Sequence, residues 1–203
     1  MEHTTNSITL RGSLLELPEF SHENHGKRFF SFSLEIPRLS GAVDILPVIA
    51  SEAIMNSIDL SGGEMLKVTG QIRSHNSRSN GVRHLLIFIF ATNICAEDSE
   101  PINEVILSGF LCKEPIFRRT PLGREICDIM LAIPRAFRRA DYLPCILWGK
   151  TAQEISQCHT RDQIYINGRL QSRIYTKLTE EGAQERTAYE ISALSAEIID
   201  DAP

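Results

Sequence analysis

The chain contains an internal repeat, and this repeat limits the possible folds more than any other feature of its sequence. Residues 6–17 (NSITLRGSLLEL) and 103–114 (NEVILSGFLCKE) share an apolar alternation and a central glycine at an offset of 97 residues. The same offset relates LEIPR at 34–38 to LAIPR at 131–135, and it grows only to 98 near the end of each half. Agreement at separated places with so little drift indicates two copies of one domain.

Each copy has the pattern of five β-strands and one short helix. Strands are expected at about 6–17, 29–38, 43–50, 64–75 and 83–94, and again at about 104–113, 124–134, 141–148, 162–175 and 186–198. The helices are expected between the third and fourth strands, at about 52–58 and 150–157. This order within about 95 residues is typical of an OB-fold, with another small barrel or sandwich as the alternative.

We therefore expect an all-β chain with two tandem five-stranded OB-fold barrels, each with a short helix between strands 3 and 4. The expected domains are residues 1–96 and 102–199. The acidic segment AEDSEP between them carries a proline, which is typical of a domain boundary.

The charge distribution permits a nucleic-acid partner although the net charge is −5. Residues 104–178 hold twelve Lys/Arg against seven Asp/Glu, whereas residues 179–203 hold one against seven. The five cysteines form no CxxC pair, the N-terminus has no signal-peptide pattern, and no apolar run approaches the roughly 18 residues of a membrane span. We expect a reduced, cytoplasmic protein that does not enter a membrane.

Two expected strands of the second copy alternate between apolar and aromatic or basic residues. In DYLPCILWGK (141–150), Tyr142, Ile146 and Trp148, the only tryptophan, share one face, and Leu143, Cys145 and Leu147 share the other. In the fourth strand Tyr165, Arg169, Gln171, Arg173 and Tyr175 are expected outside, and Ile164, Ile166, Leu170 and Ile174 inside. Sequence-independent binding of a single strand needs such a surface, with cations for phosphates and rings on which bases stack.

The second half resembles the bacterial single-stranded DNA-binding protein family. The matching motifs are NEVILSGFLCKEP (103–115), TPLGRE (120–125), LAIPR (131–135), ILWGKTAQEI (146–155) and YINGRLQSRIYT (165–176). The resemblance implies an OB-fold that binds single-stranded DNA in replication, recombination or repair, without catalysis and with little sequence preference. Family members typically present four OB-folds per assembly, so a homodimer is implied, with replication or repair proteins as possible partners.

The resemblance also implies which residues contact DNA. Phe137, Tyr142, Trp148 and Tyr175 fall where the family has base-stacking aromatics, although several members have Trp where this chain has Phe or Tyr. The basic candidates nearby are Arg135, Arg138, Arg139, Lys150, Arg169 and Arg173.

The first half lacks rings at the four matching positions, which are Ser40, Ile45, Ser51 and Ser77. Its phenylalanines are expected mainly in the core; they are Phe29, Phe30, Phe32, Phe88 and Phe90. Five basic residues of this half are possible phosphate contacts; they are Arg38, Arg73, His75, Arg78 and Arg83. We therefore expect a degenerate N-terminal OB-fold that serves assembly while the C-terminal copy does most of the DNA binding.

The sequence does not support an enzyme, a metal site or a cofactor. It has no HExxH, no GxSxG and no phosphate-binding glycine loop, and its His22-x-x-His25 and Cys158-His159 pairs have no suitable partner nearby. Two alternative functions are an OB-fold interaction scaffold in a replisome or primosome and an RNA-binding OB protein.

Overall fold

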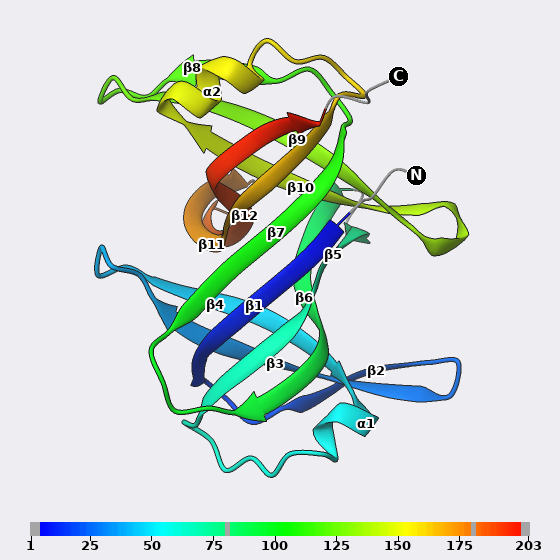
Figure 1. Cartoon of the computed structure of the whole chain (residues 1–203). Coiled ribbons are helices and arrows are strands. Elements are labelled where there is room, and N and C mark those ends of the chain that lie inside the picture. The colour runs from blue at the N-terminus through cyan, green and yellow to red at the C-terminus, as the bar shows by residue number, and fades with distance from the viewer. Residues whose placement is uncertain (1–4, 80–81, 180–181, 200–203) are drawn as a thin grey trace.

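The computed structural model describes residues 5–79, 82–179 and 182–199, which form two β-barrels joined side by side (Figure 1). The N-terminal copy contains β1 (Thr5–Leu14), β2 (Glu19–Asn24), β3 (Lys27–Pro37), β4 (Val43–Ser51), α1 (Glu52–Met55), β5 (Met65–Ser79) and β6 (Val82–Ala96). The C-terminal copy contains β7 (Ile102–Leu111), β8 (Ile116–Arg119), β9 (Glu125–Arg135), the 3₁₀ turn η1 (Ala136–Arg138), β10 (Arg139–Trp148), α2 (Gly149–Ile155), β11 (Gln163–Thr179) and β12 (Gly182–Ile199). Within these ranges, neither the length nor the apolar character of any helix suffices for a bilayer span.

Five strands close each barrel in the same order. In the N-terminal copy the ring runs β1–β3–β4–β6–β5 and back to β1, and in the C-terminal copy it runs β7–β9–β10–β12–β11 and back to β7. Only the β4–β6 and β10–β12 pairs in these rings are parallel. The prediction of two five-stranded OB-fold barrels, each with a helix between its third and fourth ring strands, is confirmed.

Two further strands, β2 and β8, lie outside the rings as hairpin partners of β3 and β9. Every side chain of β2 and β8 is exposed. The sequence did not predict them because an edge strand without a buried face carries no apolar alternation.

Equivalent side chains fill both barrels. The inward residues of the ring strands are almost completely buried, and the burial of each contributes about 1.5–3 kcal/mol. The pairs of equivalents are Leu10 and Leu107, Leu34 and Leu131, Leu46 and Leu143, Ile72 and Leu170, and Ile89 and Ile191.

Gly168 lies at a register shift in the pairing of β11 with β12. A Cβ atom at this position would lie 2.5 Å from the carbonyl oxygen of Ser192, and a Cβ on its equivalent, Gly70, would lie 2.3 Å from that of Phe90. Glycine at these two positions therefore allows the paired strands to pack closely.

A strand pair joins the two barrels into one sheet. β1 runs antiparallel to β7, with Thr5 opposite Ser108 and Arg11 opposite Ile102. In Figure 1 these two strands cross the middle of the molecule between the barrels. We propose that the domain boundary lies in the connection between β6 and β7.

Two buried aspartates fasten the copies to each other through reciprocal hydrogen bonds. Asp44 of the N-terminal copy accepts from the Ser172 backbone N–H at 2.6 Å and from the Arg38 Nε at 2.7 Å, and this hydrogen bond raises the pKa of Arg38. Asp141, the equivalent of Asp44, accepts from the Ser74 backbone N–H at 2.8 Å. Both carboxylates are fully buried. Each copy therefore completes the hydrogen bonding of a charged group in the other.

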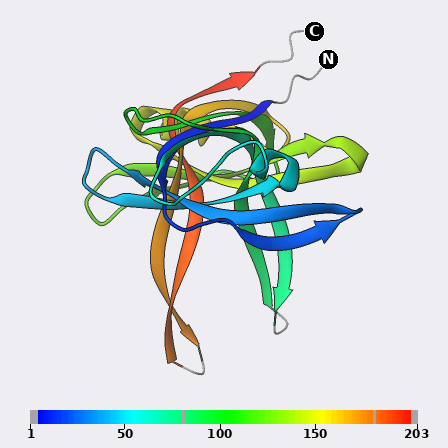
Figure 2. The ribbon, with the colours of Figure 1, turned by 90° about the horizontal axis from the view of Figure 1, so that it is seen from below.

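Two long hairpins, β5–β6 and β11–β12, extend from the barrels on the same side of the molecule (Figure 2). The part of β5 near its barrel packs against β10, and the corresponding part of β11 packs against β4. A contact of 3.4 Å between Arg186 and His84 also joins the two hairpins. Each hairpin thus brings side chains of one copy next to the third ring strand of the other.

Candidate nucleic-acid interface

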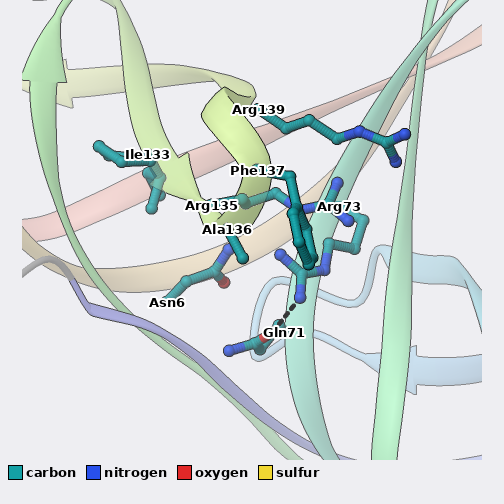
Figure 3. Close-up of a pocket in the computed structure, with 9 residues that line it drawn as sticks. Asn6, Gln71, Arg73, Ile133, Arg135, Ala136, Phe137 and Arg139 are labelled. Carbon is teal, nitrogen blue, oxygen red and sulfur yellow. Dashed lines mark hydrogen bonds between the residues drawn. The ribbon is translucent and has the colours of Figure 1, made fainter.

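A cavity of about 470 Å³ opens between the two copies, and arginines from both of them line it (Figure 3). Arg73 comes from β5, whereas Arg135 and Arg139 come from the end of β9 and the start of β10. Arg73 and Arg135 each donate to Asp141, at 2.9 and 3.2 Å, which fixes their positions. One carboxylate thus faces two guanidinium groups, and Arg139 adds a third, so the cavity keeps a positive charge that favours phosphate.

Phe137 lies at this cavity with its ring almost completely in solvent. Its side chain is 94% exposed, and Figure 3 shows it extending from η1 toward the strand that carries Arg73. Phe137 and Arg138 both adopt left-handed backbone conformations, with φ of 61° and 55°. Such a conformation costs a residue other than glycine about 1–2 kcal/mol. A strained turn that presents an unpacked ring is typical of a ligand-contacting site.

Tyr142 and Trp148 project from the outer face of β10, as the alternation predicts. Their side chains are 41% and 37% exposed, respectively. Trp148 Nε1 donates to Ser192 Oγ on β12 at 3.3 Å, which orients the indole ring across the face. Ile146 shares their side but is buried, contrary to the predicted outer row, because β10 is flanked there by both β9 and β12.

The β11–β12 hairpin carries a second aromatic and basic pair. The Arg173 guanidinium lies 5.7 Å from the centre of the Tyr175 ring, in cation–π geometry. The prediction that Ile174 faces inward is wrong, because its side chain is 68% exposed. β11 pairs with β7 only up to Gly168, so beyond the barrel the hairpin has no core to cover either face.

The remaining basic candidates lie elsewhere. Arg169 lines a second cavity of about 570 Å³. Part of its lining is equivalent to that of the first cavity, since Pro37 and Arg38 correspond to Pro134 and Arg135. This second cavity is less positive, since Asp44 and Glu100 also line it. Lys150 lies on α2, 3.3 Å from Glu154, and borders neither cavity.

Three basic candidates are exposed and carry charge that no acid offsets. Across the residues that the structure describes, Arg138, Arg139 and Arg173 make no ion pair, and all three side chains are exposed. The structure therefore combines exposed rings with free cations at η1 and on the β11–β12 hairpin.

The contribution of Arg73 to this site was not predicted. The sequence marked it as a possible phosphate contact of the N-terminal copy, but the structure places it in a cavity with Phe137 of the C-terminal copy. Residue spacing within one copy could not predict that Arg73 and Phe137 lie together, because their proximity depends on how the two copies pack.

The prediction that the N-terminal phenylalanines form core is wrong for most of them. Only Phe32 is buried, whereas Phe29, Phe30, Phe88 and Phe90 are partly exposed. Phe29, Phe88 and Phe90 have the outward parity of their strands, and Phe30 faces the fully exposed strand β2. The N-terminal copy therefore has rings on its surface, although not at the four positions that match the candidate aromatics of the C-terminal copy.

Comparison with known proteins identifies the family. A model described as the single-strand binding protein family matches residues 102–199. Single-stranded DNA-binding protein B of Bacillus subtilis is 37% identical over 87 residues, which span 39% of this chain and 75% of that protein. The chain belongs to the single-strand binding protein family. The resemblance predicted from the second half is thus confirmed. A single-stranded DNA-binding protein of Bacillus cereus is 33% identical over 104 residues, which span 48% of this chain and 58% of that protein.

Solved structures extend the similarity to both copies. The wild-type single-stranded DNA binding protein from Thermus aquaticus superimposes with a TM-score of 0.81 over 99% of this chain and 96% of its own. A deletion mutant of that protein gives a TM-score of 0.80 over 100% and 98% of the two chains. Sequence identity is 21% in both cases, so these comparisons establish the shared fold alone.

Proposed function

We propose that this protein binds single-stranded DNA without strong sequence preference and without catalysing a reaction. The observation that carries the proposal is the combination of exposed rings at Phe137, Tyr142 and Trp148 with the unpaired cations Arg138 and Arg139. Every base has a π-face, so stacking on such rings accepts any sequence. The relatives in the same family are described as single-stranded DNA-binding proteins.

The proposed contacts divide into two kinds. The rings of Phe137, Tyr142, Trp148 and Tyr175 stack on bases, at about 1–3 kcal/mol per base. The cations neutralise phosphates and therefore position the strand without reading its sequence; they are Arg135, Arg138, Arg139, Lys150, Arg169 and Arg173.

We also propose a homodimer with four OB-folds that protects single strands in the cytoplasm during replication, recombination or repair. All five cysteines are unpaired, which is typical of a reducing compartment. Light scattering with and without oligo-dT tests the assembly: the mass of two chains is expected, and a monomer in both samples would contradict it.

Fluorescence anisotropy with a labelled oligo-dT tests the binding function. Tight binding is expected, with a logarithmic salt slope of about −0.7 per phosphate contact. Phe137→Ala removes a ring that packs on little, so a weaker complex would report lost stacking rather than lost folding. Leu122→Ala is the matched control, since Leu122 is an exposed loop residue of the same copy outside the cavity.

Three results would contradict the proposal. Equal affinity of the Phe137 and Leu122 variants for oligo-dT would show that the Phe137 ring does not contact DNA. Preference for a matched RNA oligomer would favour an RNA-binding protein, and weak binding at physiological salt would favour an interaction scaffold.

A further inference from the structure

The outward face of the N-terminal copy carries a row of rings. His22 stacks on Phe29 with ring centres 4.9 Å apart, and Phe29 lies 5.9 Å from Phe90. In the β5–β6 pair Phe90 is opposite Gln71, and Phe88 is opposite Arg73. The row therefore crosses from the edge strand β2 to β5, where it meets the residues that line the first cavity.

In this row a ring occupies the strand next to the one that carries the tryptophan in the other copy. Trp148 on β10 donates to Ser192 on β12. The strand registers make Ser51 the equivalent of Trp148 and Phe90 the equivalent of Ser192, since Ile49 pairs with Phe90 as Ile146 pairs with Ser192. A large ring and a small serine thus occupy the same two places in both copies, with the strands exchanged.

The row is continuous with the candidate interface of the C-terminal copy. Arg73 faces Phe88 in the sheet and also lines the cavity that contains Phe137 and Arg139. A nucleic-acid strand bound at Phe137 and continuing toward the N-terminal copy would therefore contact Arg73 first and the N-terminal rings next. This basic junction, together with the polar Gln71 beside Phe90, matches a nucleic acid better than an apolar peptide.

We propose that the outward face of the N-terminal copy is a second contact segment for the same DNA strand. Phe29, Phe88 and Phe90 supply the stacking surfaces, and Arg73 holds the phosphate at the junction between the copies. The inference rests on the proposed function, and it gives the N-terminal copy a direct part in DNA binding besides the assembly role expected from the sequence.

The test uses the full chain. Separate halves would lose the β1–β7 pairing and the hydrogen bonds of Asp44 and Asp141 across the copy boundary, so each half could be altered in structure. The double variant Phe88→Leu/Phe90→Leu removes both rings and keeps an apolar side chain at each position. The matched variant Phe88→Tyr/Phe90→Tyr keeps both rings. Each protein is titrated with an oligo-dT of about 8 nucleotides, within the range of one OB-fold, and with one of about 30 nucleotides, long enough for two.

Quenching of Trp148 fluorescence reports the C-terminal copy, and anisotropy of the long oligomer reports the whole site. With the Leu variant we expect unchanged Trp148 quenching by the short oligomer and a loss of at least about fivefold in affinity for the long one, as stacking energies imply. The Tyr variant should bind both oligomers like the parent protein.

Two outcomes would overturn the inference and leave the proposed function in place. One is parental affinity of the Leu variant for the long oligomer, which would assign this face to a protein contact. The other is an equal loss in the Tyr variant, which would indicate altered packing rather than lost stacking. Absence of Trp148 quenching and of binding in the parent protein would instead refute the proposed function itself.

Discussion

Removal of the buried Asp44 carboxylate should destabilise both copies at once. In Asp44→Ala the Arg38 guanidinium, whose side chain is only 19% exposed, loses its carboxylate partner and keeps only its hydrogen bond to the Ser172 carbonyl oxygen. The Ser172 backbone N–H of the other copy loses its acceptor. Removal of one partner of a buried ion pair costs about 3–5 kcal/mol. We therefore expect the free energy of unfolding to fall by about this amount, in part through a bond that crosses the copy boundary.

Urea denaturation followed by Trp148 fluorescence measures this effect, because the only tryptophan lies in the copy that does not contain Asp44. With a slope of about 2 kcal/mol per molar urea, the midpoint should fall by about 2 M. Asp44→Asn keeps an acceptor oxygen and should lose less. Asp59→Ala removes an exposed carboxylate from the same copy and should change stability by no more than about 0.5 kcal/mol.

An unchanged Trp148 transition in Asp44→Ala, with a separate earlier transition in far-UV circular dichroism, would refute this reasoning. The two barrels would then unfold independently, and the hydrogen bonds between them would contribute no cooperativity.

Three further predictions concern charge and chemistry. Hydrogen bonds from the preceding turn, chiefly from Ser61, lower the pKa of Glu64 to about 2. Its carboxylate therefore contributes stability above about pH 4.3, and this stability is lost as the pH falls toward 2. Glu64→Gln should be less stable than the parent protein at pH 7, and denaturation at decreasing pH should show the difference in unfolding free energy closing. The exposed Cys112 should react first with Ellman's reagent, whereas burial raises the pKa of Cys145 and should protect it until the protein unfolds. Arg139→Gln should make the logarithmic salt slope of oligo-dT binding shallower by about 0.7, the value for one phosphate contact, whereas Arg161→Gln, outside the first cavity, should leave it unchanged.

Each of these predictions has a contradicting result. A stability gap for Glu64→Gln that persists at pH 2 would show that the hydrogen bonds do not depend on ionisation. Uniform reaction of all five cysteines in the native protein would contradict the burial pattern, and equal salt slopes for the two arginine variants would remove Arg139 from the phosphate contacts.

The barrels were predictable because the alternation of apolar residues reports which side of a strand faces a core. Leu143, Cys145 and Leu147 are buried, and Tyr142 and Trp148 are exposed, as that rule requires. The rule fails where a strand leaves the barrel or lies at an edge. Ile174 keeps the inward parity but is exposed, because its hairpin extends past the core.

The relation between the copies was not predictable from spacing alone. The Asp-x-Leu-Pro pattern at Asp44 and Asp141 is visible in the repeat, but its role depends on backbone N–H groups that only packing brings near. Similarly, the position equivalent to Trp148 in the N-terminal copy is Ser51, so the aligned sequences show no ring there. The strand register was needed to show that Phe90 supplies a ring one strand away.

Titration of the full chain with oligo-dT, followed by the fluorescence of Trp148, tests the central claim most directly. The claim is that a single strand lies on the outward face of β10, where the indole ring is exposed and oriented by Ser192. Saturable quenching is predicted, with a midpoint that rises with salt concentration. Unchanged fluorescence of the folded protein at concentrations where anisotropy reports binding would contradict the claim and place the DNA on another surface.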